Sequence, residues 1–260
     1  MTWQPLDCHA HTTLSDGALT PEELIARAAE LGVRPSICDH ISGDVNPAVR
    51  SIPHVELYLA ELEKHEGIGR GGEFCWHDAL WRELPLPMVR RFTHRVGSVH
   101  AVFRPGGGTI HAFARDYPAE LSPDRYMQIH VDNLLRLTLE MPVDILAHPT
   151  LLPLPLRPLP LEEVWSEAHE ARAIEGLRRA KIAFEVSNRY RPHERFIKRA
   201  IAAGVRISLG SDGHSHEQVA DIAWPLAEAR RLGVHDSDLY DPWVHGSKTG
   251  FFGGDPARPA

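Results

Sequence analysis

The sequence DCHAHTTLSDG, at residues 7–17, places two histidines two positions apart and follows them with an acidic turn. Side chains two apart on a strand point to the same side, so His9 and His11 can bind one metal ion together. The pair lies where a predicted first strand, residues 3–9, runs into a loop, which is where α/β folds place their sites. An HxH pair alone also occurs by chance on surface strands, so its position is the stronger evidence.

A second metal-binding pattern follows the apolar run at 205–210, where the sequence continues as Ser-Asp-Gly-His. Asp212 and His214 share one face there, and both residue types are good ligands for zinc, manganese or iron. Further candidates follow other predicted strands: His40 after 33–39, His100 late in 95–102, His148 after 143–147, and Glu73 in the glycine-rich stretch 68–75. A lone histidine at a strand end is more often structural. Recurrence at the same end of successive strands is what indicates a metal centre.

The remaining pattern alternates short apolar runs with amphipathic helical stretches. A further strand is predicted at 181–187, and helices are predicted at 21–31, 54–66, 124–141, 161–180, 192–203 and 216–232. Thr20, Pro21 and Glu23 form a helix-start signature of N-cap, proline and capping-box glutamate. Such alternation predicts parallel strands joined by crossover helices, and about seven strands favour a barrel over an open sheet.

Composition is ordinary for one globular domain. The 260 residues are 43% hydrophobic and 24% charged, with 28 Lys+Arg against 35 Asp+Glu, a net charge of −7. We expect one domain over 1–245 and a flexible tail over 246–260. The acidic balance argues against general attraction to membranes or long nucleic acid. No run approaches the roughly 18 apolar residues of a membrane span, and no signal peptide is expected from residues 1–5.

The three cysteines, Cys8, Cys38 and Cys75, are an odd number without a CxxC pair, which favours a reducing compartment and a cytoplasmic protein. Although each lies near a candidate ligand, strand alternation turns Cys8 away from His9 and His11. We therefore expect buried free thiols. The proline-rich segment 149–160 predicts an extended surface loop, with a PxxP ligand as the alternative.

Six motifs, in family order, resemble the PHP (polymerase and histidinol phosphatase) domain: DCHAHTTLSDG at 7–17, CDH at 38–40, GGEF at 71–74, VGSVH at 96–100, ILAHP at 145–149 and SLGSDGH at 208–214. The resemblance implies a distorted (β/α)7, TIM-like barrel that holds two to three zinc, manganese or iron ions. It implies these ligand sets: His9, His11, Glu73 and Asp212 for the first ion; Glu73, His100 and His148 for the second; Asp16, His40 and His214 for the third.

The implied activity is that of a metal-dependent phosphoesterase, with catalytic roles for Asp212, His214 and Glu73. A water that bridges two such ions loses its proton near neutral pH and can attack phosphorus in line. A phosphatase acting on a small phosphomonoester is the preferred hypothesis. Histidinol phosphatase and a nuclease or oligonucleotide phosphodiesterase are the alternatives within this class.

Two further readings stay open, an amidohydrolase and a non-catalytic module with the same fold. Asp16 and His40 argue against an amidohydrolase, because they supply ligands for a third ion that such enzymes lack. The chain also has no lysine before Lys64 to serve as their bridging ligand. A degenerate module would be expected to have lost ligands.

Substrate-binding candidates follow the 181–187 strand. Arg189 or Arg191 could hold a phosphate through two parallel hydrogen bonds, although both could equally solvate the start of a helix. His193 could contact substrate or donate a proton, with an ordinary exposed histidine as the alternative. Asp7 is expected to hydrogen-bond a ligand histidine. The sequence does not indicate the oligomeric state.

Overall fold

The apolar runs form one parallel sheet in the computed structural model, which describes residues 3–115 and 117–248. Its hydrogen-bonded strand order is β10-β9-β8-β5-β4-β2, and every neighbouring pair is parallel. Short strands β1 and β3 also pair in parallel and lead into β2 and β4. The strands are β1 (Ser36–Ile37), β2 (His40–Ile41), β3 (Gly69–Arg70), β4 (Glu73–Cys75), β5 (Val96–Ser98), β8 (Ile145–Leu146), β9 (Ala183–Ser187) and β10 (Ile207–Gly210).

The N-terminal segment closes this sheet into a barrel. On one side the amide of Cys8 donates to the carbonyl of Leu209, within β10, at 2.9 Å. On the other side the amide of Cys38, after β1, donates to the carbonyl of Ala10 at 2.8 Å. Residues 6–11 thus take the place of a seventh strand between the two edges of the sheet. Parallel bridges join Leu6 to Arg34 on one side and Ala10 to Gly213 on the other. The predicted distorted (β/α)7 barrel is confirmed.

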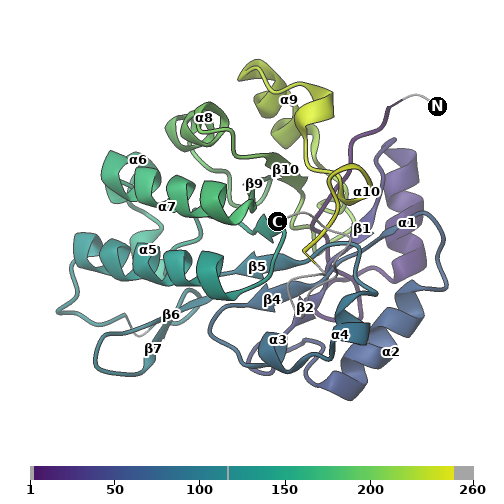
Figure 1. Ribbon diagram of the computed structural model, residues 1–260, viewed down its shortest axis with the longest axis horizontal. Helices are drawn as coiled ribbons and strands as arrows, with labels where there is room; N and C mark the ends of the chain where they lie inside the picture. Colours follow the sequence, from purple (N-terminus) through teal and green to yellow (C-terminus); the bar gives the residue numbers. More distant parts are fainter. Residues whose placement is uncertain (1–2, 116, 249–260) are drawn as a thin grey trace.

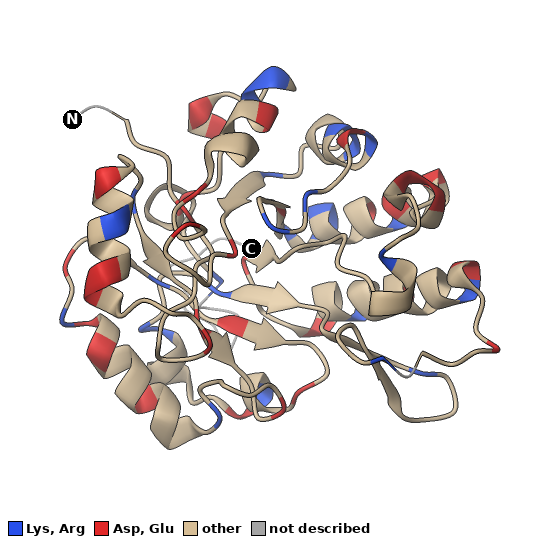
Figure 2. Ribbon diagram, turned by 180° about the vertical axis from the view of Figure 1, so that it is seen from behind, with Lys and Arg blue, Asp and Glu red and all other residues tan. Residues whose placement is uncertain are grey.

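Helices surround the strands on the outside (Figure 1). The Thr20 capping box starts the first of them as the sequence predicts. The helices are α1 (Pro21–Glu30), α2 (Ile52–Leu62), α3 (Leu80–Glu83), α4 (Leu86–Val89), α5 (Pro123–Glu140), α6 (Leu161–Val164), α7 (Glu167–Ala180), α8 (Glu194–Ala202), α9 (Ala223–Arg231) and α10 (Pro242–His245). Figure 2 shows positive and negative residues interspersed along these helices, without one basic face. In the described part of the chain, no helix combines the length and apolarity that crossing a membrane requires.

Several predicted elements differ from the structure: the strands expected over 33–39 and 68–75 each appear as two short strands, β1 with β2 and β3 with β4, and three further differences have a clear cause. The helix expected over 161–180 breaks at Trp165, which is buried and extended, and the Ser166 hydroxyl caps α7 by accepting the amide of His169. The helix expected from 216 begins only at Ala223, because the chain turns through a positive φ of 61° at Ala220. The strand expected over 95–102 ends at Ser98.

The strand expected over 95–102 ends early because the chain turns outward after β5 to form an antiparallel hairpin. This hairpin consists of β6 (Ala101–Phe103) and β7 (Thr109–His111). Its turn contains Gly106, Gly107 and Gly108, all at positive φ, where glycine is unstrained. The sequence analysis did not predict this hairpin.

The less regular segments also differ in part from expectation. The loop at 149–160 contains a short 3₁₀ helix (Leu154–Leu156) and buries Leu151, Leu152 and Leu156, so its leucines serve the core rather than a free PxxP ligand. Cys8, Cys38 and Cys75 are buried free thiols, as predicted. Within the expected tail, the amide of Lys248 donates to Asp144 at 2.6 Å, and residues 249–260 lie outside the described part.

Candidate metal centre

The carboxyl ends of the barrel strands bring nine predicted side chains into one cluster. His40 and Glu73 lie within β2 and β4. The other seven lie within residues 6–11, which serve as the seventh strand, or on the segments that follow the strands. Parallel strands place their carboxyl ends on the same face of a barrel, so residues distant in sequence meet there. The nine are His9, His11, Asp16, His40, Glu73, His100, His148, Asp212 and His214.

Glu73 stands at the middle of the cluster and is 1% exposed. Five imidazoles contact its carboxylate, two through Oε1 and three through Oε2. The distances are 3.2 Å from Oε1 to His100 Nε2, 2.9 Å from Oε1 to His148 Nε2, 2.7 Å from Oε2 to His40 Nδ1, 3.6 Å from Oε2 to His9 Nε2 and 3.7 Å from Oε2 to His11 Nε2. This carboxylate is therefore placed to bridge two cations.

Two aspartates complete the cluster. Asp212 Oδ1 lies 3.5 Å from His11 Nε2, whose ring approaches that of His9 with 3.1 Å between the two Nε2 atoms. Asp16 contacts three imidazoles: Nδ1 of His11 at 3.3 Å, Nε2 of His40 at 3.4 Å and Nε2 of His214 at 3.3 Å. The resulting groups of converging ligand atoms are His9, His11, Asp212; His40, Glu73, His100; and His11, Asp16, His40, His214.

Several buried ligand atoms in the cluster face one another without well-formed hydrogen bonds. Among the described residues, Glu73 Oε2, His11 Nδ1 and His40 Nδ1 are buried and lack hydrogen-bond geometry, although His40 Nδ1 lies 2.7 Å from Glu73 Oε2 and His11 Nδ1 lies 3.3 Å from Asp16 Oδ1. Buried polar atoms are normally satisfied, because each unsatisfied one costs about 1–3 kcal/mol. Oxygen and imidazole nitrogen atoms that converge without hydrogen bonds fit divalent cations between them.

The charges in the cluster are strongly coupled. Burial opposes ionisation of Glu73, but His40, His100 and His9 hold the pKa of its carboxyl well below the usual range. Burial likewise opposes ionisation of Asp212, yet the hydrogen bond from His11 keeps its pKa low. Burial lowers the pKa of His100 to about 4, whereas at His40 burial is outweighed by Glu73 and Asp16, which raise the pKa to about 10. Ionised carboxylates and neutral imidazoles are the forms that bind metal, so a cation entering the cluster displaces protons from imidazoles such as that of His40.

Backbone geometry is unusual at two of the nine positions. His148 has a φ of 27° and Asp212 a φ of 50°, which side-chain-bearing residues adopt rarely and at a cost of about 1–3 kcal/mol. Gly17 shows why glycine is needed in the first motif, since a Cβ there would lie 2.4 Å from the carbonyl oxygen of His11. The positive φ angles of His148 and Asp212 are of the kind that clusters at functional sites.

The structure adds a supporting carboxylate that the sequence analysis did not identify. Glu185, on β9, is fully buried, and its Oε1 lies 2.8 Å from His9 Nδ1. Its Oε2 accepts the backbone amide of His148 at 2.5 Å. A charged residue inside the apolar stretch Ala-Phe-Glu-Val-Ser was the available signal. Glu185 orients His9 and holds the strained backbone of His148.

Other residues near the ligands have supporting contacts. Asp7 hydrogen-bonds a candidate ligand, as expected: it accepts the backbone amide of His9 at 3.2 Å, and it also accepts the Ser211 hydroxyl at 2.6 Å, so it ties two strand ends together. Cys75 is buried, but its Sγ lies 3.1 Å from His100 Nδ1 and therefore contacts a candidate ligand. Asp39, which precedes His40 in the CDH motif, accepts the amide and hydroxyl of Thr12, both at 2.7 Å.

The three predicted substrate-binding residues separate in the structure. Arg189 reaches the cluster: its Nη1 lies 2.6 Å from His214 Nδ1 and 3.7 Å from Asp212 Oδ1, and its side chain is 38% exposed. Arg191 instead donates to the side chain of Asn188 and stacks on Trp224.

His193 also turns away from the cluster. Its Nε2 lies 2.6 Å from Glu170 Oε1, in a network of charged residues between α7 and α8. The predicted contact of His193 with substrate therefore has no support in the structure. The histidine is in addition mostly buried, at 8% side-chain exposure, rather than the ordinary exposed residue of the alternative reading.

Aromatic residues from two loops border the cluster. The ring of Phe113 lies 5.6 Å from that of His100, and the ring of Tyr190 lies 5.4 Å from that of His148. Arg157, from the proline-rich segment, stacks near both, at 5.1 Å from Phe113 and 5.7 Å from Tyr190. The 149–160 segment thus reaches the rim of the centre.

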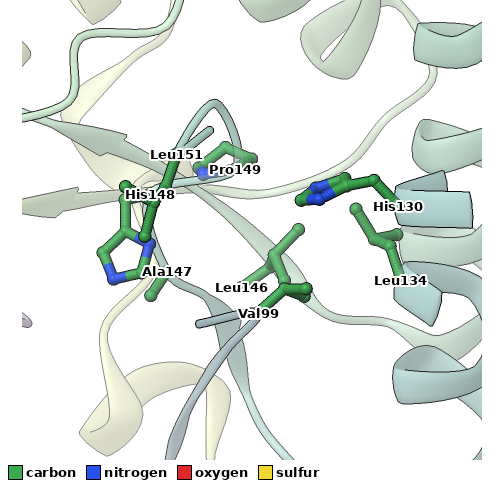
Figure 3. Close-up of a pocket in the computed structure, with 8 residues that line it drawn as sticks. All are labelled: Val99, His130, Leu134, Leu146, Ala147, His148, Pro149 and Leu151. Atoms are coloured by element: carbon green, nitrogen blue, oxygen red, sulfur yellow. The ribbon is translucent and has the colours of Figure 1, made fainter. Parts of the chain in front are cut away.

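A small cavity lies behind His148 (Figure 3). His148 borders it on one side, with its ring turned away toward Glu73, and His130, on α5, lies on the other side. The remaining lining residues are Val99, Leu134, Leu146, Ala147, Pro149 and Leu151. The apolar lining and small size of this cavity fit a packing defect rather than a substrate site.

Comparisons with known proteins agree with this architecture. No family model matches the chain. The 5'-3' exoribonuclease Rnm of Salmonella typhimurium is 42% identical over an alignment of 72 residues, which covers 23% of this chain and 24% of that protein. The chain thus spans about a quarter of the length of this curated relative.

A solved structure extends the similarity over the fold. Histidinol phosphate phosphatase of Lactococcus lactis, in complex with zinc, L-histidinol and phosphate, superimposes with a TM-score of 0.57 and 15% identity. The superposition covers 91% of this chain and 95% of that one. Both similar proteins are hydrolases that act on phosphoester bonds.

Proposed function

We propose that this chain is a metal-dependent phosphoesterase of the PHP type that hydrolyses a small phosphomonoester. The observation that carries the proposal is the convergence of nine buried or partly buried histidine and carboxylate side chains at the carboxyl ends of a seven-stranded barrel. The shared fold with a zinc-containing phosphatase supports it.

The proposed ligand sets are those that the resemblance to the PHP domain implies, and the convergence of the same nine side chains supports them. One ion is assigned to His9, His11, Glu73 and Asp212, a second to Glu73, His100 and His148, and a third to Asp16, His40 and His214, with zinc, manganese and iron as the candidate metals. Divalent ions held there supply Lewis acidity toward phosphate oxygens and toward water.

The chain's own residues would orient and neutralise the substrate. Arg189 lies at the rim beside Asp212 and His214 with its guanidinium partly exposed, so it can donate two parallel hydrogen bonds to a phosphate. Glu73, Asp212 and His214 border the position of the reacting group and take the catalytic roles. Phe113, with half of its surface exposed, limits access beside His100.

The charge distribution favours a small substrate over long nucleic acid. The net charge is −7, and the outer helices mix both signs (Figure 2). Histidinol phosphate is one candidate, supported by the shared fold. Hydrolysis at the end of an oligonucleotide is the second candidate function, favoured by the stretch that is 42% identical to an exoribonuclease. A cytoplasmic location is proposed from the three buried free thiols.

A comparison of ester classes tests this proposal. An aryl phosphate monoester and the matching diester are incubated with the protein and manganese, each also with chelator. We expect chelator-sensitive turnover of the monoester. Preference for the diester would shift the assignment to the nuclease-type alternative, and turnover of neither would overturn the proposal.

Two arginine variants serve as a matched pair in the same assay. Arg189→Ala should raise KM by about tenfold, since one charge-assisted phosphate contact contributes about 1.5 kcal/mol. Arg191→Ala should leave KM unchanged, because Arg191 is occupied by Asn188 and Trp224. Equal effects of the two changes would contradict the assignment of Arg189.

A further inference from the structure

A second group of potential metal ligands lies outside the nine side chains of the candidate centre. Asp44 follows β2, His77 follows β4, and His111 is the last residue of β7. Asp44 Oδ2 lies 2.7 Å from His77 Nε2 and 3.8 Å from His111 Nδ1. One ligand atom of each residue lies within 4.8 Å of those of the other two. The rings of His77 and His111 are 5.1 Å apart and nearly perpendicular.

The geometry of this group resembles a site more than a chance surface contact. The side chain of His77 is only 5% exposed, and its Nδ1 is buried without a hydrogen-bond partner among the residues that the structure describes. His111 and Asp44 are partly exposed, at 42% and 54%, so solvent and ions can reach the group. The buried imidazole of His77 and the partly exposed side chains of Asp44 and His111 therefore form a ligand group that is open to solvent on one side.

Neighbouring residues hold two of the three ligands in place. The carboxylate of Asp78, next to His77, accepts the Ser42 hydroxyl at 2.6 Å and the amides of Gly43 and Asp44. It also accepts the amide of Leu80 at 2.8 Å. Because one carboxylate organises both loops, Asp44 and His77 are positioned before any ion arrives, which reduces the ordering cost of binding.

We propose that Asp44, His77 and His111 form a peripheral site for a divalent transition metal of the zinc class. Two imidazoles and one carboxylate are a common protein ligand set for zinc and leave a fourth position for water. Ligand atoms of a tetrahedral zinc site, with bonds of about 2.0–2.2 Å, are separated by roughly 3.3–3.6 Å, so small shifts of these side chains suffice.

The consequence of binding reaches the main centre through the hairpin. His111 ends β7, and the next residue, Ala112, donates its amide to the carbonyl of His100 at 2.7 Å. Phe113 follows and lies beside the His100 ring. An ion held by His111 together with the β2 and β4 loops would therefore tie the β6–β7 hairpin to the barrel next to the candidate centre.

Zinc titration of the full-length protein tests the proposal. After removal of metal by chelator, zinc bound per chain is measured by competition with a chromophoric chelator and by elemental analysis. His111→Ala should bind about one equivalent fewer than the unchanged protein. Asp44→Asn provides a second variant at an exposed position in case the first fails to fold. His235→Ala is the matched control, since His235 is exposed and belongs to none of the ligand groups in the described chain.

Protease cleavage provides an independent measurement. Zinc should slow cleavage at the Gly106–Gly108 turn in the unchanged protein and in His235→Ala, but not in His111→Ala. Equal zinc binding by all variants would overturn the proposal and leave Asp44 and His77 as a hydrogen-bonded pair only. Failure of the main centre is distinguishable, because a change at Glu73 would then leave the zinc content unaltered while His111→Ala still lowered it.

Discussion

Two fully enclosed glutamates, Glu73 in the barrel and Glu170 between the outer helices, have opposite surroundings. Glu170, on α7, is 0% exposed. Its carboxylate accepts hydrogen bonds from Arg195 Nε at 2.9 Å and from Arg199 Nε at 3.2 Å, and His193 Nε2 lies 2.6 Å from its Oε1. Two guanidinium groups thus neutralise it within the chain. Glu73 is 1% exposed and is contacted by five imidazoles.

The difference lies in what the partners can supply. An arginine always carries charge and donates hydrogen bonds, so the Glu170 network is complete by itself. An imidazole can give up its proton and then present a lone pair to a metal ion, so the imidazoles around Glu73 can exchange their protons for a cation. A buried carboxylate such as Glu73, with no arginine or lysine among its described contacts, therefore indicates a cation-binding site. A buried carboxylate such as Glu170, which is paired with arginines, indicates a role in stabilising the fold.

Replacing Glu73 should have the largest effect on activity. Glu73→Gln preserves volume but removes the bridging charge, so metal content should fall and kcat/KM should drop by more than about 100-fold. Excess metal should not restore the lost turnover. Elemental analysis and phosphatase kinetics measure both effects, with circular dichroism to establish folding. Unchanged kinetics in a folded variant would remove Glu73 from the centre.

Glu185 should show an intermediate effect, because it contacts candidate ligands rather than the metal position. Glu185→Gln weakens the orientation of His9 and the support of the His148 backbone, so metal affinity should fall by about 10–100-fold. Titration with excess manganese should restore most of the activity, in contrast to Glu73→Gln. A variant that stays inactive at saturating metal would place Glu185 among the direct ligands.

Glu170 should have the smallest effect on activity and act on stability instead. Glu170→Gln leaves Arg195 and Arg199 without their anion, and we expect the free energy of unfolding at pH 7 to fall by about 2–3 kcal/mol. Phosphatase kinetics should be unchanged. Urea unfolding measures the loss. Glu175→Gln, on the exposed face of the same helix, is the matched control and should leave the free energy of unfolding nearly unchanged, because exposed ion pairs contribute little.

The stabilisation by Glu170 should also depend on pH. Burial opposes ionisation of Glu170, but hydrogen bonds from Arg195 and His193 hold its pKa below the usual range. Its contribution is therefore fully present above the ordinary glutamate pKa of about 4.3 and is lost as the pH falls through the lower folded-state pKa. The stability difference between the unchanged protein and Glu170→Gln should shrink in acid. A constant difference would contradict the ionised state of Glu170.

The convergence of the nine side chains could be predicted because it depends on local rules. Side chains alternate along a strand with a period of two, and parallel strands end on one face, so His9, His11, His100 and Asp212 follow from position alone. The same reasoning placed Arg189, Arg191 and His193 together as substrate contacts, because all three follow β9. It cannot say where a loop turns after its strand ends.

What the sequence by itself determined is the alternation of the main strands and helices, the barrel class and the list of side chains at the carboxyl ends of its strands, since hydrophobic periodicity and strand direction are local properties of the chain. Only the tertiary structure decided that Arg191 and His193 turn to Trp224 and Glu170, that Glu185 supports His9, and that Asp44, His77 and His111 meet. These outcomes depend on contacts between segments remote in sequence. The physical reason is that a buried polar atom takes whichever partner packing brings within hydrogen-bonding distance, and no local pattern encodes that distance.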